Sequence, residues 1–153
     1  MEKIIKSAIK LAEAKYPGVY FLNTTQELKN FYTSGLKKHK RWKAIASIEN
    51  WLPVDDVFLQ DFRKELDKRK IKTQVIFKEA GLKFEPKGLK YRKVKVMSDK
   101  YKFKSSVDIL NDKLLIMSPK MKVKGLVIEI EPMLDIFNDI FDLLWETLPE
   151  VKK

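Results

Sequence analysis

The strongest structural signal lies in the stretch SSVDILNDKLLIMSPKMKVKGLVIEIEPMLDIFNDIFDLLWETLP, residues 105–149. Its first two apolar runs, 107–110 and 114–117, flank Asn111-Asp112, which predicts a two-residue turn between antiparallel strands. A third apolar run at 126–130 predicts another strand. Pro132 suits the first turn of a helix, and apolar residues recur at helical spacing from there to Leu148. This part of the chain is therefore expected to form three strands and a closing helix.

Helical and extended patterns alternate in the residues that come before this stretch. Thr24 and Glu27 form a capping-box pattern, and Gly35, on the helix that they open, is expected in a crowded contact. Tyr91, Val94 and Val96 indicate one strand in an otherwise polar, basic segment over 82–104. The other predicted elements are helices at 2–15 and 54–70 and strands at 19–22, 42–47 and 71–77.

The order of these elements, βαβαβ followed by ββββα, predicts an α/β fold with a mixed sheet flanked by helices. We expect one domain over residues 17–150, preceded by an amphipathic helix over residues 1–16. A chain of 153 residues that is 44% hydrophobic is long enough for one domain with a hydrophobic core.

Composition excludes several kinds of protein. The chain has no Cys and one His, so neither a disulfide scaffold nor a Cys or multi-His metal site is expected. No apolar run approaches the roughly 20 residues that span a bilayer, and the N-terminus lacks the apolar core of a signal peptide. We predict a cytoplasmic protein with no metal, no cofactor and no membrane contact.

The net charge of +11 suggests an anionic partner, with nucleic acid the usual first candidate. Only four of the 32 basic residues are Arg, however, and a Lys-rich surface is a weaker sign of nucleic-acid recognition. Residues 83–104 carry nine basic and two acidic residues, whereas 125–150 carry seven acids and no Lys or Arg. Opposite charges in one small domain favour internal pairing or ordered self-association as much as an external ligand.

Two basic stretches, residues 37–43 and 83–104, are the candidates for an anion or nucleic-acid surface. Trp42 lies within the first of them and could stack on a base. The alternative is that residues 37–43 place cations at the end of a helix and Trp42 in the core. The residues of this predicted surface are Lys37, Lys38, Lys40, Arg41, Arg92, Lys93 and Lys95.

A second candidate site follows the strand at 42–47, because ligands of open α/β sheets bind beyond the carboxyl ends of strands. Ser47, Glu49, Asn50 and Trp51 are the small-molecule candidates there, with an ordinary loop as the alternative. Asp108 alternates with apolar neighbours, so it points away from the face that holds Val107. It is a candidate ligand residue too, with a solvent-facing strand position as the alternative.

The C-terminal stretch resembles the end of the TrmB-type archaeal and bacterial regulators, and the resemblance runs in order over roughly residues 17–148. The corresponding segments are Asn111-Asp112-Lys113, Ile116-Met117-Ser118, Gly125–Glu129, Phe141–Trp145 and, upstream, Pro17–Phe21, Thr25–Leu28 and Arg69–Ile76.

The resemblance implies the fold of a phospholipase D superfamily half-domain. Catalytic members of that superfamily carry H-x-K-x(4)-D, and with Asn111 at the aspartate position the histidine and lysine fall at Lys104 and Ser106. None of the three catalytic residue types is present. A histidine is the nucleophile of that chemistry, so we expect no enzyme activity.

TrmB-type regulators begin with a winged helix-turn-helix and a coiled coil, so residues 1–16 would correspond to the end of the coiled coil. The resemblance therefore implies a regulatory effector domain that forms a homodimer, responds to a small sugar-like molecule and contacts DNA through a separate module. The alternative is a stand-alone basic module that binds nucleic acid itself.

Overall fold

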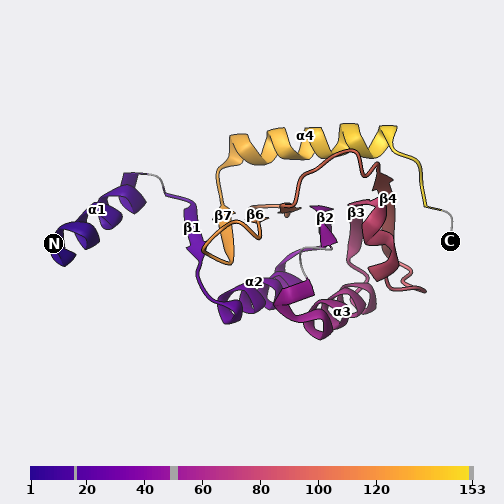
Figure 1. The fold of residues 1–153 in the computed structure, drawn as a ribbon, viewed down its shortest axis with the longest axis horizontal. Coiled ribbons are helices and arrows are strands. Elements are labelled where there is room, and N and C mark those ends of the chain that lie inside the picture. The colour runs from indigo at the N-terminus through magenta and orange to yellow at the C-terminus, as the bar shows by residue number, and fades with distance from the viewer. Residues whose placement is uncertain (16, 49–51, 152–153) are drawn as a thin grey trace.

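The computed structural model describes residues 1–15, 17–48 and 52–151, in which helices pack on both faces of one sheet (Figure 1). The helices are α1 (Glu2–Lys15), α2 (Thr25–Lys38), α3 (Leu52–Lys68), the 3-10 helix η2 (Glu79–Phe84) and α4 (Glu131–Thr147). The strands are β1 (Val19–Leu22), β2 (Arg41–Ala46), β3 (Lys72–Lys78), β4 (Arg92–Met97), β5 (Ser106–Ile109), β6 (Leu114–Met117) and β7 (Gly125–Ile128).

The seven strands form a mixed sheet in the order β1-β7-β6-β5-β2-β3-β4. Strands β2, β3 and β4 are parallel, and every other pairing is antiparallel. The sheet and its flanking helices confirm the predicted fold class. The two-residue turn is confirmed as well, because the Leu110 N–H donates to the Lys113 carbonyl across Asn111-Asp112 at 2.9 Å.

Local capping chemistry explains where α2 and α4 begin. The Glu27 N–H donates to the Thr24 hydroxyl at 3.1 Å, and the Glu27 carboxylate accepts from the Asn23 N–H at 2.6 Å. Pro132 lies in the first turn of α4, as predicted. The sequence pattern did not predict η2, whose six residues carry no helical period of their own.

The two faces of the sheet hold two different cores. Helices α2 and α3 cover one face, where Tyr32, Trp42 and Phe62 pack ring against ring. Helix α4 covers the other face, on which Phe141 and Leu114 are fully buried. Helix α1 lies apart from these layers, at the indigo end of the chain (Figure 1). None of the helices in the described part of the chain is long and apolar enough to cross a bilayer.

Helix α4 covers one cross-strand row of side chains and leaves the next one partly open. The row Ile109, Leu114 and Ile128 is buried. The neighbouring row on the same face is more exposed. It comprises Ile45, Val107, Ile116, Leu126 and Phe21, of which the first four are half-buried and Phe21 is 55% exposed. An apolar strip of the sheet thus remains beside α4.

The two edges of the sheet are finished differently. At the β4 edge, the backbones of Lys95 and Glu150 form an isolated antiparallel β-bridge. Beside it, the Val151 N–H donates to the Val94 carbonyl at 3.4 Å. At the opposite edge, β1 is hydrogen-bonded to β7 on one side. Gly18 leads into β1 with φ +89°, a conformation that favours glycine, and a Cβ there would meet the Glu129 carbonyl oxygen at 2.8 Å.

Candidate nucleic-acid interface

Basic residues gather where the three parallel strands begin. Because β2, β3 and β4 run in the same direction, the segments that lead into them lie side by side. They meet at the edge of the sheet that is formed by the N-terminal ends of these three strands. These segments are 37–41, 69–72 and 90–93, and each is rich in Lys or Arg. Helices α2 and α3 also end at this edge, so their negative dipole ends favour cations there.

Two hollows that share Arg41 and Lys72 adjoin each other along this edge, and together they are called the basic groove. The larger, of about 800 Å³, is lined by cations from the ends of α2 and α3 and the starts of β2 and β3. The smaller, of about 320 Å³, shares Arg41 and Lys72 with it and adds Tyr91 and Gln74. The exposed cations of this basic groove are Lys37, Lys40, Arg41, Arg69, Lys70, Lys72, Lys90 and Lys93.

Among the described residues, no carboxylate lines the two hollows. Glu65 lies close by and pairs with Arg69, with an Nε to Oε1 distance of 2.7 Å. The hydrogen bond from Arg69 is the main cause of a lowered pKa at Glu65, which keeps that carboxylate ionised. The groove is therefore a strongly positive surface with one partly neutralised arginine.

The structure brings together four of the seven residues predicted for this surface, namely Lys37, Lys40, Arg41 and Lys93. Lys38 lies on another side of α2, in a separate hollow bordered by β1. Trp42 is buried in the core, 3% exposed, so the core interpretation of that residue is confirmed and the stacking one is wrong.

Arg92 and Lys95 are two further corrections to the predicted surface, because both side chains are buried. The Arg92 guanidinium makes two hydrogen bonds to the Glu85 carboxylate, at 2.5 and 3.0 Å. Lys95 donates to the Trp145 carbonyl and lies 4.9 Å from the centre of the Trp145 ring. Both cations hold secondary-structure elements together instead of facing solvent.

Sequence reasoning missed three residues of the groove, Arg69, Lys70 and Lys72, and included Lys90 only as part of the basic stretch 83–104. A usable signal was present, since each parallel strand is preceded by a basic run, and parallel strands begin at the same edge. The missing step was to combine the three runs, which lie up to about 50 residues apart along the chain.

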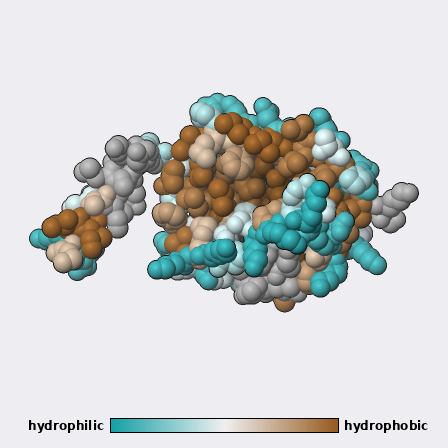
Figure 2. Space-filling model, turned by 45° about the horizontal axis from the view of Figure 1, so that its top comes forward, coloured by the Kyte–Doolittle hydropathy of each residue, from teal (hydrophilic) through white to brown (hydrophobic). Residues whose placement is uncertain are grey.

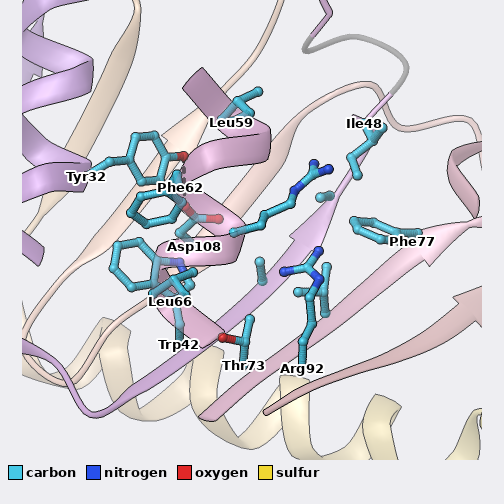
Figure 3. Close-up of a pocket in the computed structure, with 14 residues that line it drawn as sticks. Tyr32, Trp42, Ile48, Leu59, Phe62, Leu66, Thr73, Phe77, Arg92 and Asp108 are labelled. Atoms are coloured by element: carbon cyan, nitrogen blue, oxygen red, sulfur yellow. Dashed lines mark hydrogen bonds between the residues drawn. The ribbon is translucent and has the colours of Figure 1, made fainter. Parts of the chain in front are cut away.

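Asp108 is buried beneath α3 instead of facing solvent, so the solvent-facing interpretation is wrong. It accepts a hydrogen bond of 2.8 Å from the Tyr32 hydroxyl (Figure 3). Burial raises the pKa of Asp108 to about 6, while hydrogen bonds from Tyr32 and Trp42 and the charges of Arg92 and Arg63 act in the opposite direction. Burial, followed by the charge of Asp108, also raises the pKa of Tyr32 well above 10.

A small cavity of about 50 Å³ adjoins this pair, between α3 and the sheet. Its walls are mainly apolar, with Leu59, Phe62 and Phe77 among them, and Arg92 faces Asp108 across it (Figure 3). A space of this size holds about one to three water molecules and no larger ligand. The arrangement is therefore a polar element of the core.

The predicted small-molecule site is only partly described. Glu49, Asn50 and Trp51 lie outside the described residues. Ser47 is fully buried, and its N–H donates to the Ser106 hydroxyl at 3.0 Å. Asp108 faces the core beneath α3, whereas Val107 lies on the opposite face of the sheet. The structure does not bring Ser47 and Asp108 together with an open cavity.

Comparisons with known proteins identify the fold. No protein-family model matches the sequence, and no curated protein matches it either. Among solved structures, the chain is similar to NucT from Helicobacter pylori, with a TM-score of 0.61, 12% identity and coverage of 87% of this chain and 97% of that one. It is also similar to the phospholipase D family member Nuc from Salmonella typhimurium, with a TM-score of 0.55, 13% identity and coverage of 88% and 98%. The chain has a phospholipase D-like fold.

A third similar structure is that of TrmBL2, described as an archaeal chromatin protein with a novel mode of DNA binding. The TM-score is 0.60 at 13% identity, and the match covers 98% of this chain. The present chain spans 60% of the length of TrmBL2.

The three positions that the sequence resemblance assigns to catalytic residues carry Lys104, Ser106 and Asn111. Ser106 begins β5 and is buried, with its hydroxyl already accepting the Ser47 N–H. Lys104 is exposed in the preceding loop, and Asn111 is exposed in the turn after β5. Among the described residues, no three His, Asp or Glu side chains lie close enough together to hold a metal ion.

Proposed function

We propose that this domain is a non-catalytic regulatory domain that binds the phosphate backbone of nucleic acid through the basic groove. The observation that carries the proposal is the lining of the groove, to which the described part of the chain contributes eight exposed cations and no carboxylate. Each cation that neutralises a phosphate releases a condensed counterion, and this release supplies most of the affinity in sequence-independent binding. The similarity to a DNA-binding chromatin protein supports the same function.

The chemistry of the groove favours backbone contacts over base reading. Six of its eight cations are Lys, which binds phosphate as a point charge, and only Arg41 and Arg69 carry the planar guanidinium fork that matches a guanine edge. Tyr91 is half-buried in the smaller hollow, and the Lys90 Nζ atom lies over its ring, 6.0 Å from the ring centre. We therefore expect binding to duplexes of any sequence.

The absence of catalysis is part of the proposal, and it rests on Lys104, Ser106 and Asn111, the residues that the sequence resemblance aligns with the His, Lys and Asp of phospholipase D enzymes. A buried serine hydroxyl that accepts a backbone hydrogen bond cannot replace a lysine that binds phosphate. We expect no hydrolysis of bis(p-nitrophenyl) phosphate above the rate without protein. Hydrolysis that is lost on changing Lys104 or Ser106 would contradict this part.

Self-association also belongs to the proposal, because Ile4 and Ile5 of α1 are 72% and 53% exposed and form part of an amphipathic helix. A helix of 14 residues gains most of its stability from packing of its apolar side. Small-ligand sensing is left out of the proposal, because Ser47 and Asp108 are buried and the cavity that the described residues form beside Asp108 does not include Ser47.

The groove is tested by charge reversal with a matched control. The groove variant is Lys40→Glu/Arg41→Glu/Lys72→Glu. The control, Lys3→Glu/Lys6→Glu/Lys83→Glu, has the same net charge but changes exposed lysines on α1 and on η2, which follows the opposite end of β3. Binding of a fluorescent duplex is measured by anisotropy at several salt concentrations.

We expect the wild-type chain and the control to bind with affinity that falls steeply as salt rises, and the groove variant to lose at least tenfold at low salt. With about five phosphate contacts, the slope of log K against log salt is about −4.5. An equal loss of affinity in the control and the groove variant would show that binding depends on the overall charge of the chain and not on the groove. No binding by the wild-type chain at low salt would overturn the proposal.

A further inference from the structure

A second set of exposed lysines lies at the edge of the sheet opposite the basic groove. Strands β2, β3 and β4 begin at the groove and end at this second edge, where β5 and β7 begin and β6 ends. Two connections lie there, residues 98–105 between β4 and β5 and residues 118–124 between β6 and β7, and we call them the lysine loops. Ser106 pairs with Met117, so the end of the first loop adjoins the start of the second.

The lysine loops are almost purely basic. They contain one acid, Asp99, whose carboxylate accepts the Ala80 N–H at 3.2 Å. In the part of the chain that the structure describes, none of their lysines forms an ion pair with a carboxylate. Their positive charges therefore remain available for an anionic partner. The six exposed lysines are Lys100, Lys102, Lys104, Lys120, Lys122 and Lys124.

Both loops begin with the same hydrogen-bonded turn. The hydroxyls of Ser98 and Ser118 accept the N–H of the lysine two residues further on, Lys100 and Lys120, each at 3.3 Å. The carbonyls of the two serines accept from the residues three further on, at 3.2 and 3.1 Å. Such local bonds order a turn before any ligand binds. The lysines are thus presented from defined backbone, which lowers the entropic cost of binding.

The lysine loops and the basic groove are separate surfaces. The seven residues of β3, at about 3.3 Å each, place the two edges roughly 20 Å apart. On one face of the sheet, α4 lies between the edges with five acids and no Lys or Arg. Figure 2 shows a broad hydrophobic area over α4 and the strands beside it. This face offers a phosphate backbone no continuous basic path from one surface to the other.

A single duplex cannot reach both surfaces. Duplex DNA has a persistence length of about 50 nm, so it does not bend around a domain whose edges are roughly 20 Å apart. Two duplexes on opposite edges, however, repel each other little. Charges are screened over about 8 Å at physiological ionic strength, which is less than the separation of the two edges.

We infer that the lysine loops bind the phosphate backbone of a second duplex, so that one chain bridges two duplexes. The inference rests on the proposed function, because the basic groove holds the first duplex. Eight exposed cations line the groove and six lie on the loops, so the groove fills first and the loops fill second.

The first experiment measures whether the full chain joins two duplexes. A duplex of about 12 base pairs, roughly one helical turn, is attached to beads, and capture of a fluorescent duplex of equal length is measured at low salt. The loop variant is Lys102→Glu/Lys120→Glu/Lys122→Glu. Its control, Lys3→Glu/Lys6→Glu/Lys64→Glu, changes the net charge by the same amount at exposed positions on α1 and α3. Circular dichroism checks that both variants fold.

We expect the wild-type chain and the control to capture the fluorescent duplex and the loop variant to capture at least tenfold less. Anisotropy should show that the loop variant still binds one duplex within about threefold of the wild-type affinity. A wild-type chain that binds in solution but captures nothing would overturn the inference and leave the groove proposal standing. A wild-type chain that binds no duplex would overturn both.

The second experiment measures the molar ratio, because two associated chains that each hold one duplex would also give capture. We expect saturation at two duplexes per wild-type chain and at one per loop-variant chain, whether or not the chains associate. One duplex per wild-type chain, or undiminished capture by the loop variant, would show that chain pairing joins the duplexes and would overturn the inference. With about nine phosphate contacts in all, the slope of log capture against log salt should be about −8.

Discussion

Asp108 is the residue whose environment gives the clearest pH dependence. Burial raises its pKa to about 6, above the value near 3.9 of an exposed aspartate. Between these pH values the folded chain keeps a proton that the unfolded chain has released. The free energy of unfolding should therefore fall as the pH rises from about 4 to 6, by up to about 3 kcal/mol.

The variant Asp108→Asn keeps an acceptor for the Tyr32 hydroxyl but does not titrate. We expect urea unfolding of this variant to lack the fall between pH 4 and 6 that the wild-type chain shows. Other carboxylates act in the opposite direction: Glu129, whose pKa is lowered despite partial burial, loses its stabilising effect as the pH falls. The difference between the two chains isolates Asp108, and parallel curves would contradict the prediction.

Lys70 combines a strained backbone with a place in the basic groove. Its φ of 59° lies in the left-handed region. This conformation terminates α3 and lets the Ile71 N–H donate to the Leu66 carbonyl. A side chain costs about 1 kcal/mol in this conformation and glycine costs less. Lys70→Gly should raise the free energy of unfolding by about 0.5–1 kcal/mol and weaken duplex binding.

The opposite signs of these two effects separate folding from binding at one residue. Lys64→Gly, at an exposed position inside α3, is the control and should lower stability by about 1 kcal/mol without weakening binding. Urea unfolding and anisotropy on the same preparations test both. A Lys70→Gly chain that is less stable than the wild-type chain would show that the lysine side chain stabilises the end of α3.

At the scale of elements, Gly35 sets how closely α2 approaches β2. A Cβ at this position would lie 2.9 Å from two carbon atoms of the Trp42 ring, as the expectation of a crowded contact at Gly35 anticipated. Trp42 is held on its other sides by Tyr32 and Phe62, so it cannot easily move. We expect Gly35→Ala to destabilise the domain by about 1–3 kcal/mol despite the higher helix propensity of Ala.

Thermal unfolding of Gly35→Ala beside Ser34→Ala tests this prediction, because Ser34 is exposed one residue away on the same helix. Only the glycine variant should unfold at a clearly lower temperature. A stabilised Gly35→Ala chain would mean that α2 shifts away from the sheet at little cost.

Elements were predictable from sequence where local chemistry determines them. The Thr24–Glu27 cap, the Asn111-Asp112 turn and Pro132 each act within a few residues of themselves. The predicted helix at 54–70 was shifted by two residues, because α3 spans Leu52–Lys68. Its end was hard to predict, since no glycine marks it and Lys70 adopts the left-handed conformation itself.

The candidate sites were less predictable because they depend on contacts between distant residues. Strand alternation correctly placed Asp108 and Val107 on opposite faces, yet only the packing of Tyr32, 76 residues away, shows that the Asp108 face is buried. Arg92 and Arg41 are equally basic in sequence, but Glu85 holds one of them inside the domain.

At the scale of the whole molecule, the basic groove predicts binding without sequence preference. Contacts to phosphate fix a protein on a duplex but carry no sequence information directly. We expect two duplexes of unrelated sequence and equal length to differ less than threefold in affinity, and both affinities to fall in parallel as salt rises. Competition between labelled and unlabelled duplexes measures this. A difference of a hundredfold would indicate base reading by Arg41 or Arg69.

The different finish of the two sheet edges limits how this protein can aggregate. A sheet with two open edges can add further chains at both sides and grow into a fibre. Here Glu150 and Val151 occupy part of the β4 edge, which leaves the short strand β1 as the more open edge. Edge-to-edge addition through β1 would end with a pair of molecules. Removal of the residues after Pro149 would open the second edge, and concentrated solutions of such a shortened chain should form fibrils sooner than the full chain.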